Sequence, residues 1–127
     1  MGMSNRSFFN GGKMKKIINI DGKDYTMKSS AYTQFAYRNM TNRSLLKDLQ
    51  HITSLAEKIE EDFSVIDEIT EPILDIAFVM IQEADEKQVA TKEEFYKSIE
   101  SMYDNFEWIN EVLALAINPL SRQLQNN

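Results

Sequence analysis

The chain has 127 residues and a formal net charge of −6, a length that fits one compact domain. It contains no cysteine and a single histidine, His51, so disulfide frameworks, thiolate catalysis and two-histidine metal motifs are excluded. Its four glycines form neither a G-x-G-x-x-G motif nor a Walker-type phosphate loop, and its longest apolar run, six residues, is far shorter than the roughly 20 that span a membrane.

The N-terminal residues differ in composition from the rest of the chain, because serine, asparagine and glycine dominate them. Such a composition is typical of a flexible leader, and we leave residues 1–13 outside the predicted fold. A single domain is predicted over residues 14–123, and residues 124–127 are expected to form a polar tail.

The clearest local signal lies in residues 14–28, which predict an antiparallel hairpin. Asp21 and Gly22 suit a type I′ turn, because both central positions of that turn need a positive φ. The turn places Ile18 opposite Tyr25. Since an isolated hairpin is marginally stable in water, we expect the helices that follow to cover its apolar face.

Two amphipathic helices are predicted after the hairpin. Ser29 and Ser30 can cap the first, and apolar residues recur at helical spacing on both. In the first helix the stripe is Tyr32, Phe35, Ala36 and Met40, and in the second it is Leu45, Leu49, Ile52, Leu55 or Ala56, and Ile59.

A third helix is predicted from about Ile66 or Pro72 to Ala84. Pro72 follows Thr70 and Glu71, and proline is tolerated in the first turn of a helix. Apolar residues between positions 73 and 81 cover more than one helical face, so we expect this helix at the centre of the domain.

The C-terminal third predicts one or two further helices. Thr91 and Glu94 have the spacing of a capping box, and Pro119 is expected to close the last helix. Two runs at helical spacing lie between them, with the second extending or restarting the first: Phe95, Ile99, Met102 and Phe106, then Ile109, Val112, Leu113, Ala116 and Ile117. The predicted fold is therefore α+β and mostly α, an N-terminal β-hairpin packed on four to five helices.

The acidic residues carry no catalytic pattern. Adjacent carboxylates such as Glu93 and Glu94 normally stay solvated and ionised on a polar helix face, whereas general acid–base catalysis needs a carboxyl group held away from water. His51 flanks an apolar stripe and is expected at the surface or its boundary. No catalytic, cofactor-binding or metal site is predicted, and we expect the protein not to be an enzyme.

Five of the thirteen aromatic residues lie between positions 95 and 108. The simplest interpretation places Phe95 and Phe106 in the core, with Trp108 covering its edge. The alternative is an exposed groove for a partner helix, where aromatic side chains are favoured anchors. Its candidate partner-binding residues are Phe106, Trp108, Ile109 and Val112, with Glu107 and Glu111 around them.

The charge of the chain is divided unevenly, with +6 on residues 1–50 and −12 on residues 51–127. The acidic excess disfavours binding to nucleic-acid phosphates. The basic residues of the first half are most simply solvating residues, although they could contact an acidic partner. The asymmetry also permits self-association, basic end to acidic end.

The order of these features carries a resemblance to a known family. In chain order the features are a lysine-rich start, Ile-x-Ile-Asp-Gly-Lys-x-Tyr ending at Tyr25, the run Ser44-Leu45-Leu46, an acidic helical middle, Phe106-Glu107-Trp108-Ile109, and the run from Ile117 to Gln123. From about Met14 to Gln123 the chain resembles the tail assembly chaperones of long-tailed, siphovirus-like phages and prophages of Gram-positive bacteria.

The resemblance implies a non-enzymatic protein of virion morphogenesis in the host bacterial cytoplasm. Such chaperones bind the tape measure protein, keep this long apolar helical protein soluble and help recruit tail tube subunits. Members are often made in a short and a frameshifted long form, and this chain would correspond to the short form. Residues 1–13 depart from the family pattern.

A different class of function also fits the composition. A small prophage-encoded regulatory module could use its acidic half as a nucleic-acid mimic and inhibit a host protein. Gene neighbourhood distinguishes the two, because a tail tube gene upstream and a very long tape measure gene downstream would indicate the chaperone.

Overall fold

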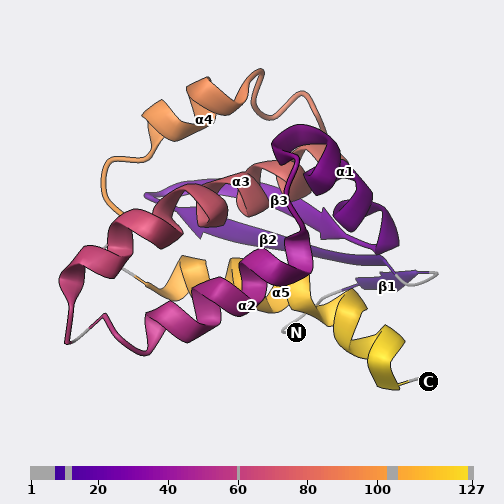
Figure 1. Cartoon of the computed structure of the whole chain (residues 1–127). Coiled ribbons are helices and arrows are strands. Elements are labelled where there is room, and N and C mark those ends of the chain that lie inside the picture. Colours follow the sequence, from indigo (N-terminus) through magenta and orange to yellow (C-terminus); the bar gives the residue numbers. More distant parts are fainter. Residues whose placement is uncertain (1–7, 11–12, 60, 103–105, 126–127) are drawn as a thin grey trace, which may run out of the picture.

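The computed structural model describes residues 8–10, 13–59, 61–102 and 106–125. These residues form a three-stranded antiparallel sheet and five α-helices (Figure 1). In chain order the elements are β1 (Phe8–Asn10), β2 (Lys13–Ile20), β3 (Lys23–Ser29), α1 (Ala31–Thr41), α2 (Leu45–Ala56), the 3₁₀ turn η2 (Phe63–Val65), α3 (Ile66–Ala84), α4 (Lys92–Ser98) and α5 (Glu107–Gln125). The predicted fold class, α+β and mostly α, is confirmed.

The hairpin has the predicted turn and register. Asp21 and Gly22 have φ values of 54° and 87°, as a type I′ turn requires, and Ile18 pairs with Tyr25. β1 adds a third strand, pairing Phe8 with Lys15. This strand lies within the segment that we left outside the predicted fold, and three residues are too few to show a strand alternation in sequence.

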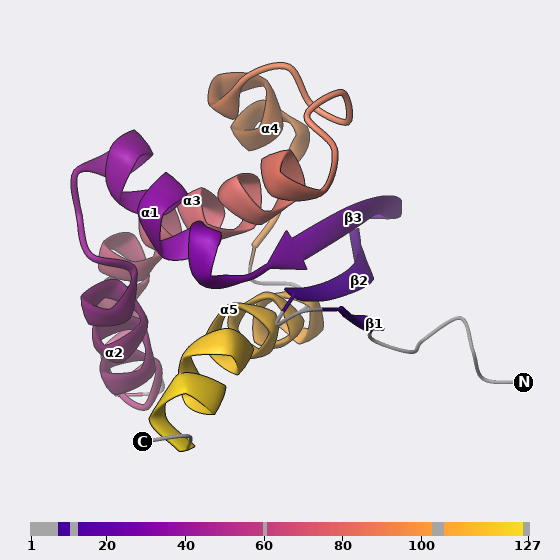
Figure 2. The same cartoon turned by 90° about the vertical axis from the view of Figure 1, so that its right-hand side faces the viewer.

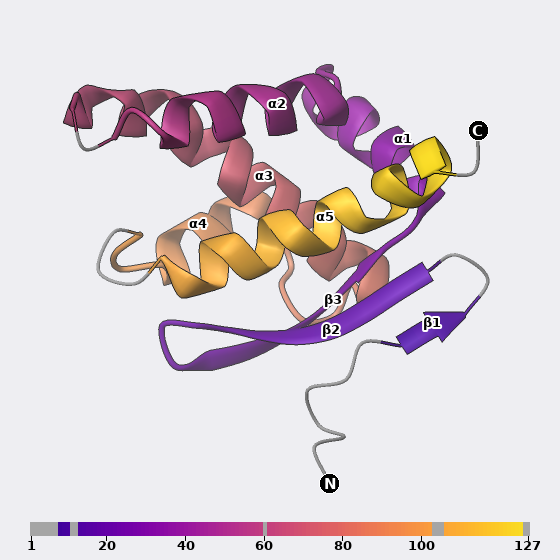
Figure 3. The ribbon, with the colours of Figure 1, turned by 90° about the horizontal axis from the view of Figure 1, so that it is seen from below.

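The helices cover one face of the sheet. Figures 2 and 3 show the hairpin on one side of the molecule, α3 and α5 in the middle, and α2 on the far side. α3 packs against β3 and α5 packs against β2. The residues of the hairpin that face these helices are fully buried, and they are Ile18, Ile20, Tyr25 and Met27.

α3 is the central helix, as predicted. It contacts β3 and the helices α1, α2, α4 and α5, and its residues from Ile73 to Ile81 are all buried. It begins at Ile66, so Pro72 lies inside the helix and not in its first turn. None of the helices in the described part of the chain combines the length and the apolar character needed to cross a bilayer.

Pro119 does not close the last helix, and that prediction is wrong. α5 continues through Pro119 to Gln125. A proline inside a helix lacks the N–H that would bond the carbonyl four residues earlier, here that of Leu115. The buried Ser29 hydroxyl at the end of β3 donates to this carbonyl oxygen at 2.8 Å and replaces the missing donor.

The segment between the last two helices also differs from the prediction. α4 ends at Ser98 and Ile99 is extended, so the run from Phe95 to Phe106 does not share one helical face. Thr91 caps α4 by accepting from the Glu94 N–H, but the Glu94 carboxylate accepts from Ala90, one residue before the cap. The pattern therefore restarts at α5 and does not extend from α4.

Replacing Gly22 by valine should destabilise the protein by about 1–2 kcal/mol, the typical cost of a left-handed conformation for an L-residue. A Cβ added at Gly22 would meet no described atom within 4 Å, so this cost comes from the backbone alone. Urea denaturation followed by circular dichroism measures it. Gly22→Asn is the matched control, because asparagine tolerates this region and should cost less. Equal stability of Gly22→Val and the parent chain would contradict the turn assignment.

Candidate functional site

The structure buries most of the predicted partner-binding residues. Trp108 is 2% exposed, and Ile109 and Val112 are also in the core, on the side of α5 that faces β2 and α3. Phe106 is 43% exposed, so it is not core as the simplest interpretation had it. The prediction that these four residues line an exposed groove is therefore wrong for Trp108, Ile109 and Val112.

Four exposed apolar side chains lie on α1, α2 and α5, while the other large ones in the described residues are Ile17, Phe63 and Phe106. The predicted stripe of α1 is wrong for two of its members, because the helix buries Thr33 and Tyr37 and leaves Tyr32 and Phe35 outside, with ring centroids 5.8 Å apart. We call the four residues on these three helices, with their exposed fractions, the apolar face: Tyr32 (58%), Phe35 (59%), Leu46 (45%) and Ile117 (40%).

An open groove of about 550 Å³ lies between α2 and the C-terminal half of α5. α2 turns Leu45 and Ile52 into the core, and the neighbouring side of the helix lines the groove. Short side chains at Thr53 and Ser54 leave room in its wall. The lining of this α2–α5 groove is Leu46, Leu49, Gln50, Thr53, Ser54, Glu57, Ile117 and Leu120.

A second hollow, of about 290 Å³, lies between α1 and the start of α2. Leu46 lines both cavities, so they share one wall. The lining of this α1–α2 hollow is Ala31, Gln34, Phe35, Arg38, Ser44, Leu45 and Leu46. Together the two cavities form an extended surface, apolar along α2 and α5 and more polar beside α1.

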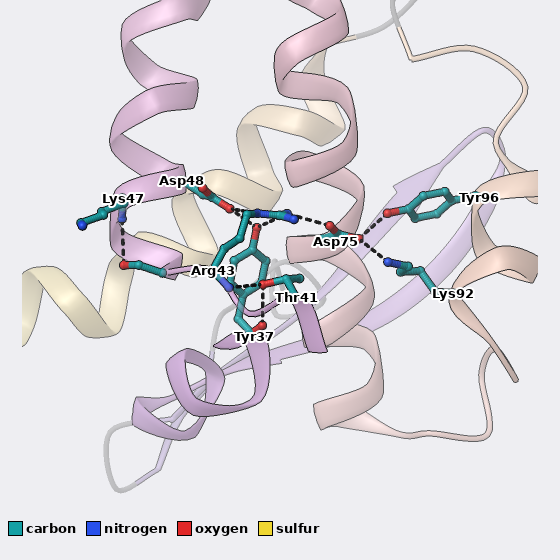
Figure 4. A network of polar contacts seen from close by, with 9 residues as sticks. Tyr37, Thr41, Arg43, Lys47, Asp48, Asp75, Lys92 and Tyr96 are labelled. Atoms are coloured by element: carbon teal, nitrogen blue, oxygen red, sulfur yellow. Dashed lines mark hydrogen bonds and ion pairs between the residues drawn. The ribbon is translucent and has the colours of Figure 1, made fainter. Parts of the chain in front are cut away.

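A polar network fixes α1 and α2, two of the three helices that carry this surface (Figure 4). Its centre is Asp75 on α3, which is 1% exposed. One carboxylate oxygen accepts from Arg43 Nη2 at 2.8 Å, and the other accepts from the Tyr96 hydroxyl and lies 3.4 Å from Lys92 Nζ. Asp75 thereby connects α3 to the α1–α2 turn on one side and to α4 on the other.

The second half of the network joins α1 to α2. Arg43 Nε donates to Asp48 at 2.8 Å, and Tyr37 donates to the same oxygen at 2.5 Å. Two helix caps hold the backbone beside Arg43: Asn42 ends α1 in the left-handed region, and Ser44 accepts from the Lys47 N–H at the start of α2. The guanidinium is thus aimed at both carboxylates.

The chemistry of this network favours a structural role. The cations Arg43 and Lys92 face the carboxylates of Asp48 and Asp75, so the charges balance. Burial, followed by the hydrogen bond to Asp48, raises the pKa of Tyr37 above its usual value near 10, and burial with the bond to Asp75 does the same for Tyr96. The hydrogen bond to Asp48 raises the pKa of Arg43. Neither tyrosine is therefore poised as a nucleophile or base at neutral pH.

The single histidine lies apart from the polar network. His51 is exposed on α2, with Nε2 3.7 Å from the Glu68 carboxylate. Within the described ranges no three histidine, aspartate or glutamate side chains come together as a metal site would require. Asp75 was not among the predicted functional residues, although a lone acid among the apolar residues of a central helix is a usable signal.

Comparison of the chain with protein-family models, with curated proteins and with solved structures returned no match. The function has therefore to be inferred from the residues described above. Among them, the α2–α5 groove with the apolar face is the candidate functional site.

Stability should fall as the pH rises above about 10, because the unfolded tyrosines lose their protons there while folded Tyr37 and Tyr96 retain theirs. Each contributes about 1.4 kcal/mol of loss by about pH 11. Urea midpoints at mildly and strongly alkaline pH measure the loss. Tyr37→Phe/Tyr96→Phe is the control, since every other titration is common to both proteins. A variant as alkali-sensitive as the parent would contradict the raised pKa values.

Proposed function

We propose that this protein is a non-enzymatic phage tail assembly chaperone that binds the tape measure protein in the host bacterial cytoplasm. It keeps that protein soluble and helps recruit tail tube subunits. The observation that carries the proposal is the open α2–α5 groove bordered by the apolar face. The order of sequence features that resembles this chaperone family supports the same function.

The dimensions of the groove suit a helical client. α2 has 12 residues, so it lines the groove over about 18 Å, or a little over three helical turns. Leu46 and Ile117 present apolar surface from opposite walls, and a client helix would place its apolar stripe between them. Binding would remove apolar area of both partners from water, which is the main driving force of such association.

The composition of the chain also suits a chaperone. Gln50, Thr53 and Ser54 interrupt the apolar lining, which limits the size of the contiguous apolar patch. The net charge of −6 opposes association of chaperone–client complexes with one another. A surface of this kind can hold an apolar helix without aggregating through it.

The test is co-expression with the tape measure protein that we expect to be encoded beside this chain, followed by pull-down and a solubility assay. Leu46→Ser/Ile117→Ser should release the client into the insoluble fraction, because truncating a contact anchor typically costs about 2 kcal/mol, or roughly 30-fold in Kd. Ile17→Ser is the matched control, since Ile17 is exposed on the sheet face that points away from the helices.

A folded double variant that still keeps the client soluble would contradict the assignment of the groove. A parent chain that never binds the tape measure protein would contradict the chaperone function itself. The acidic regulatory module would then be the remaining proposal, carried by the charge of −12 on residues 51–127.

A further inference from the structure

One cation lines the α1–α2 hollow, and a second lies in the first turn of α2 next to Leu46, which lines it. Arg38, in the last turn of α1, lines the hollow and is exposed, and Lys47 is exposed on α2 directly after Leu46. In the described part of the chain neither side chain takes part in an ion pair, whereas Arg43, which lies between them in the sequence, has two. Their charge is therefore available to a partner.

The carboxylates of the surrounding elements are engaged with other groups. Asp48 accepts from Arg43 and Tyr37. Glu83 of α3 accepts from the hydroxyls of Ser30 and Thr33 at the start of α1, both at 2.6 Å. Among the residues that line the groove and the hollow, the one carboxylate is Glu57, at the opposite end of α2. No carboxylate that lines the hollow therefore neutralises the positive charge of Arg38.

We infer that the partner of this surface is an amphipathic helix that carries acidic side chains at the end lying over the α1–α2 hollow. The inference rests on the proposed function, in which the α2–α5 groove takes an apolar helix. Because Leu46 lines both cavities, a helix seated in the groove that continues by about one turn, or 5.4 Å, passes over the hollow. Its carboxylates then meet Arg38 and Lys47, while its apolar stripe stays between α2 and α5.

The local charge gives the partner a direction and a selectivity. A partner with basic residues at this end would meet two like charges, which raises the cost of the wrong orientation. The overall charge of the chain acts in the opposite sense, because a net charge of −6 attracts basic peptides in general. A preference for an acidic helix can therefore come only from a local cluster of cations.

The experiment uses two labelled synthetic helical peptides with the same leucine stripe, one flanked by glutamate and one by lysine at the same end. Fluorescence anisotropy at low salt should show the glutamate peptide binding the full chain about three- to tenfold more tightly, the range expected of two exposed ion pairs. Added salt should remove most of this difference.

Charge reversal supplies the decisive comparison. Arg38→Glu/Lys47→Glu should reverse the preference between the two peptides. The matched control Lys15→Glu/Lys87→Glu changes the net charge by the same amount at exposed positions on β2 and in the loop after α3, and it should keep the preference of the parent chain. Circular dichroism of both variants establishes that they are folded.

Each other outcome overturns the inference in a recognisable way. Equal affinity for the two peptides, or a preference unchanged by Arg38→Glu/Lys47→Glu, contradicts the acidic partner and leaves the groove intact. If neither peptide binds, the assignment of the groove as a helix-binding site is contradicted as well. Self-association of the parent chain in sedimentation, abolished by the same reversal, would assign this surface to a second copy. A single-stranded oligonucleotide that binds the parent and not the reversed variant would assign it to nucleic acid.

Discussion

The arrangement of the helices depends on one buried carboxylate. Asp75 lies on the most buried helix of the domain, and it is the one charged side chain among the fully buried residues of the described chain. Burying an ionised group without partners costs several kcal/mol, so Asp75 requires the cations and the hydroxyl that surround it. Because these partners come from the α1–α2 turn and from α4, their bonds fix both segments on α3.

This constraint determines which residues are left for binding. Tyr37 points inward to Asp48 and Arg43, and that sets the rotation of α1 about its axis. Thr33 then lies inside, and Tyr32 and Phe35 remain outside, although a purely apolar stripe would turn them inward. The exposed aromatic pair of the candidate site is thus a consequence of the polar network.

A second constraint completes the site from the other side. The bond from Ser29 to the Leu115 carbonyl allows α5 to continue through Pro119. Ile117 and Leu120 can then form the wall opposite α2. A helix that ended at Pro119 would leave α2 with little to face at this end, and the groove would be open surface.

The features that could be predicted from the sequence are those set by neighbouring residues. The type I′ turn, the Ser30 and Thr91 caps and the central position of α3 each follow from a short local pattern. Periodicity alone could not place the end of α4 or the course of α5 through Pro119, because a distant hydroxyl decides the latter. The candidate site joins α1, α2 and α5. Tertiary packing decides which faces of these helices stay uncovered, and a local sequence pattern does not contain that information.

The most direct test of the groove as the binding site is methyl NMR of the chain titrated with a helical segment of the proposed client, the tape measure protein. We expect the largest chemical-shift changes at four residues that line the groove: Leu46, Leu49, Ile117 and Leu120. Ile17 on the outer sheet face and the core residue Ile109 should change little. Changes concentrated at Ile17 or around α4, with the groove methyl groups unmoved, would contradict the groove as the binding site.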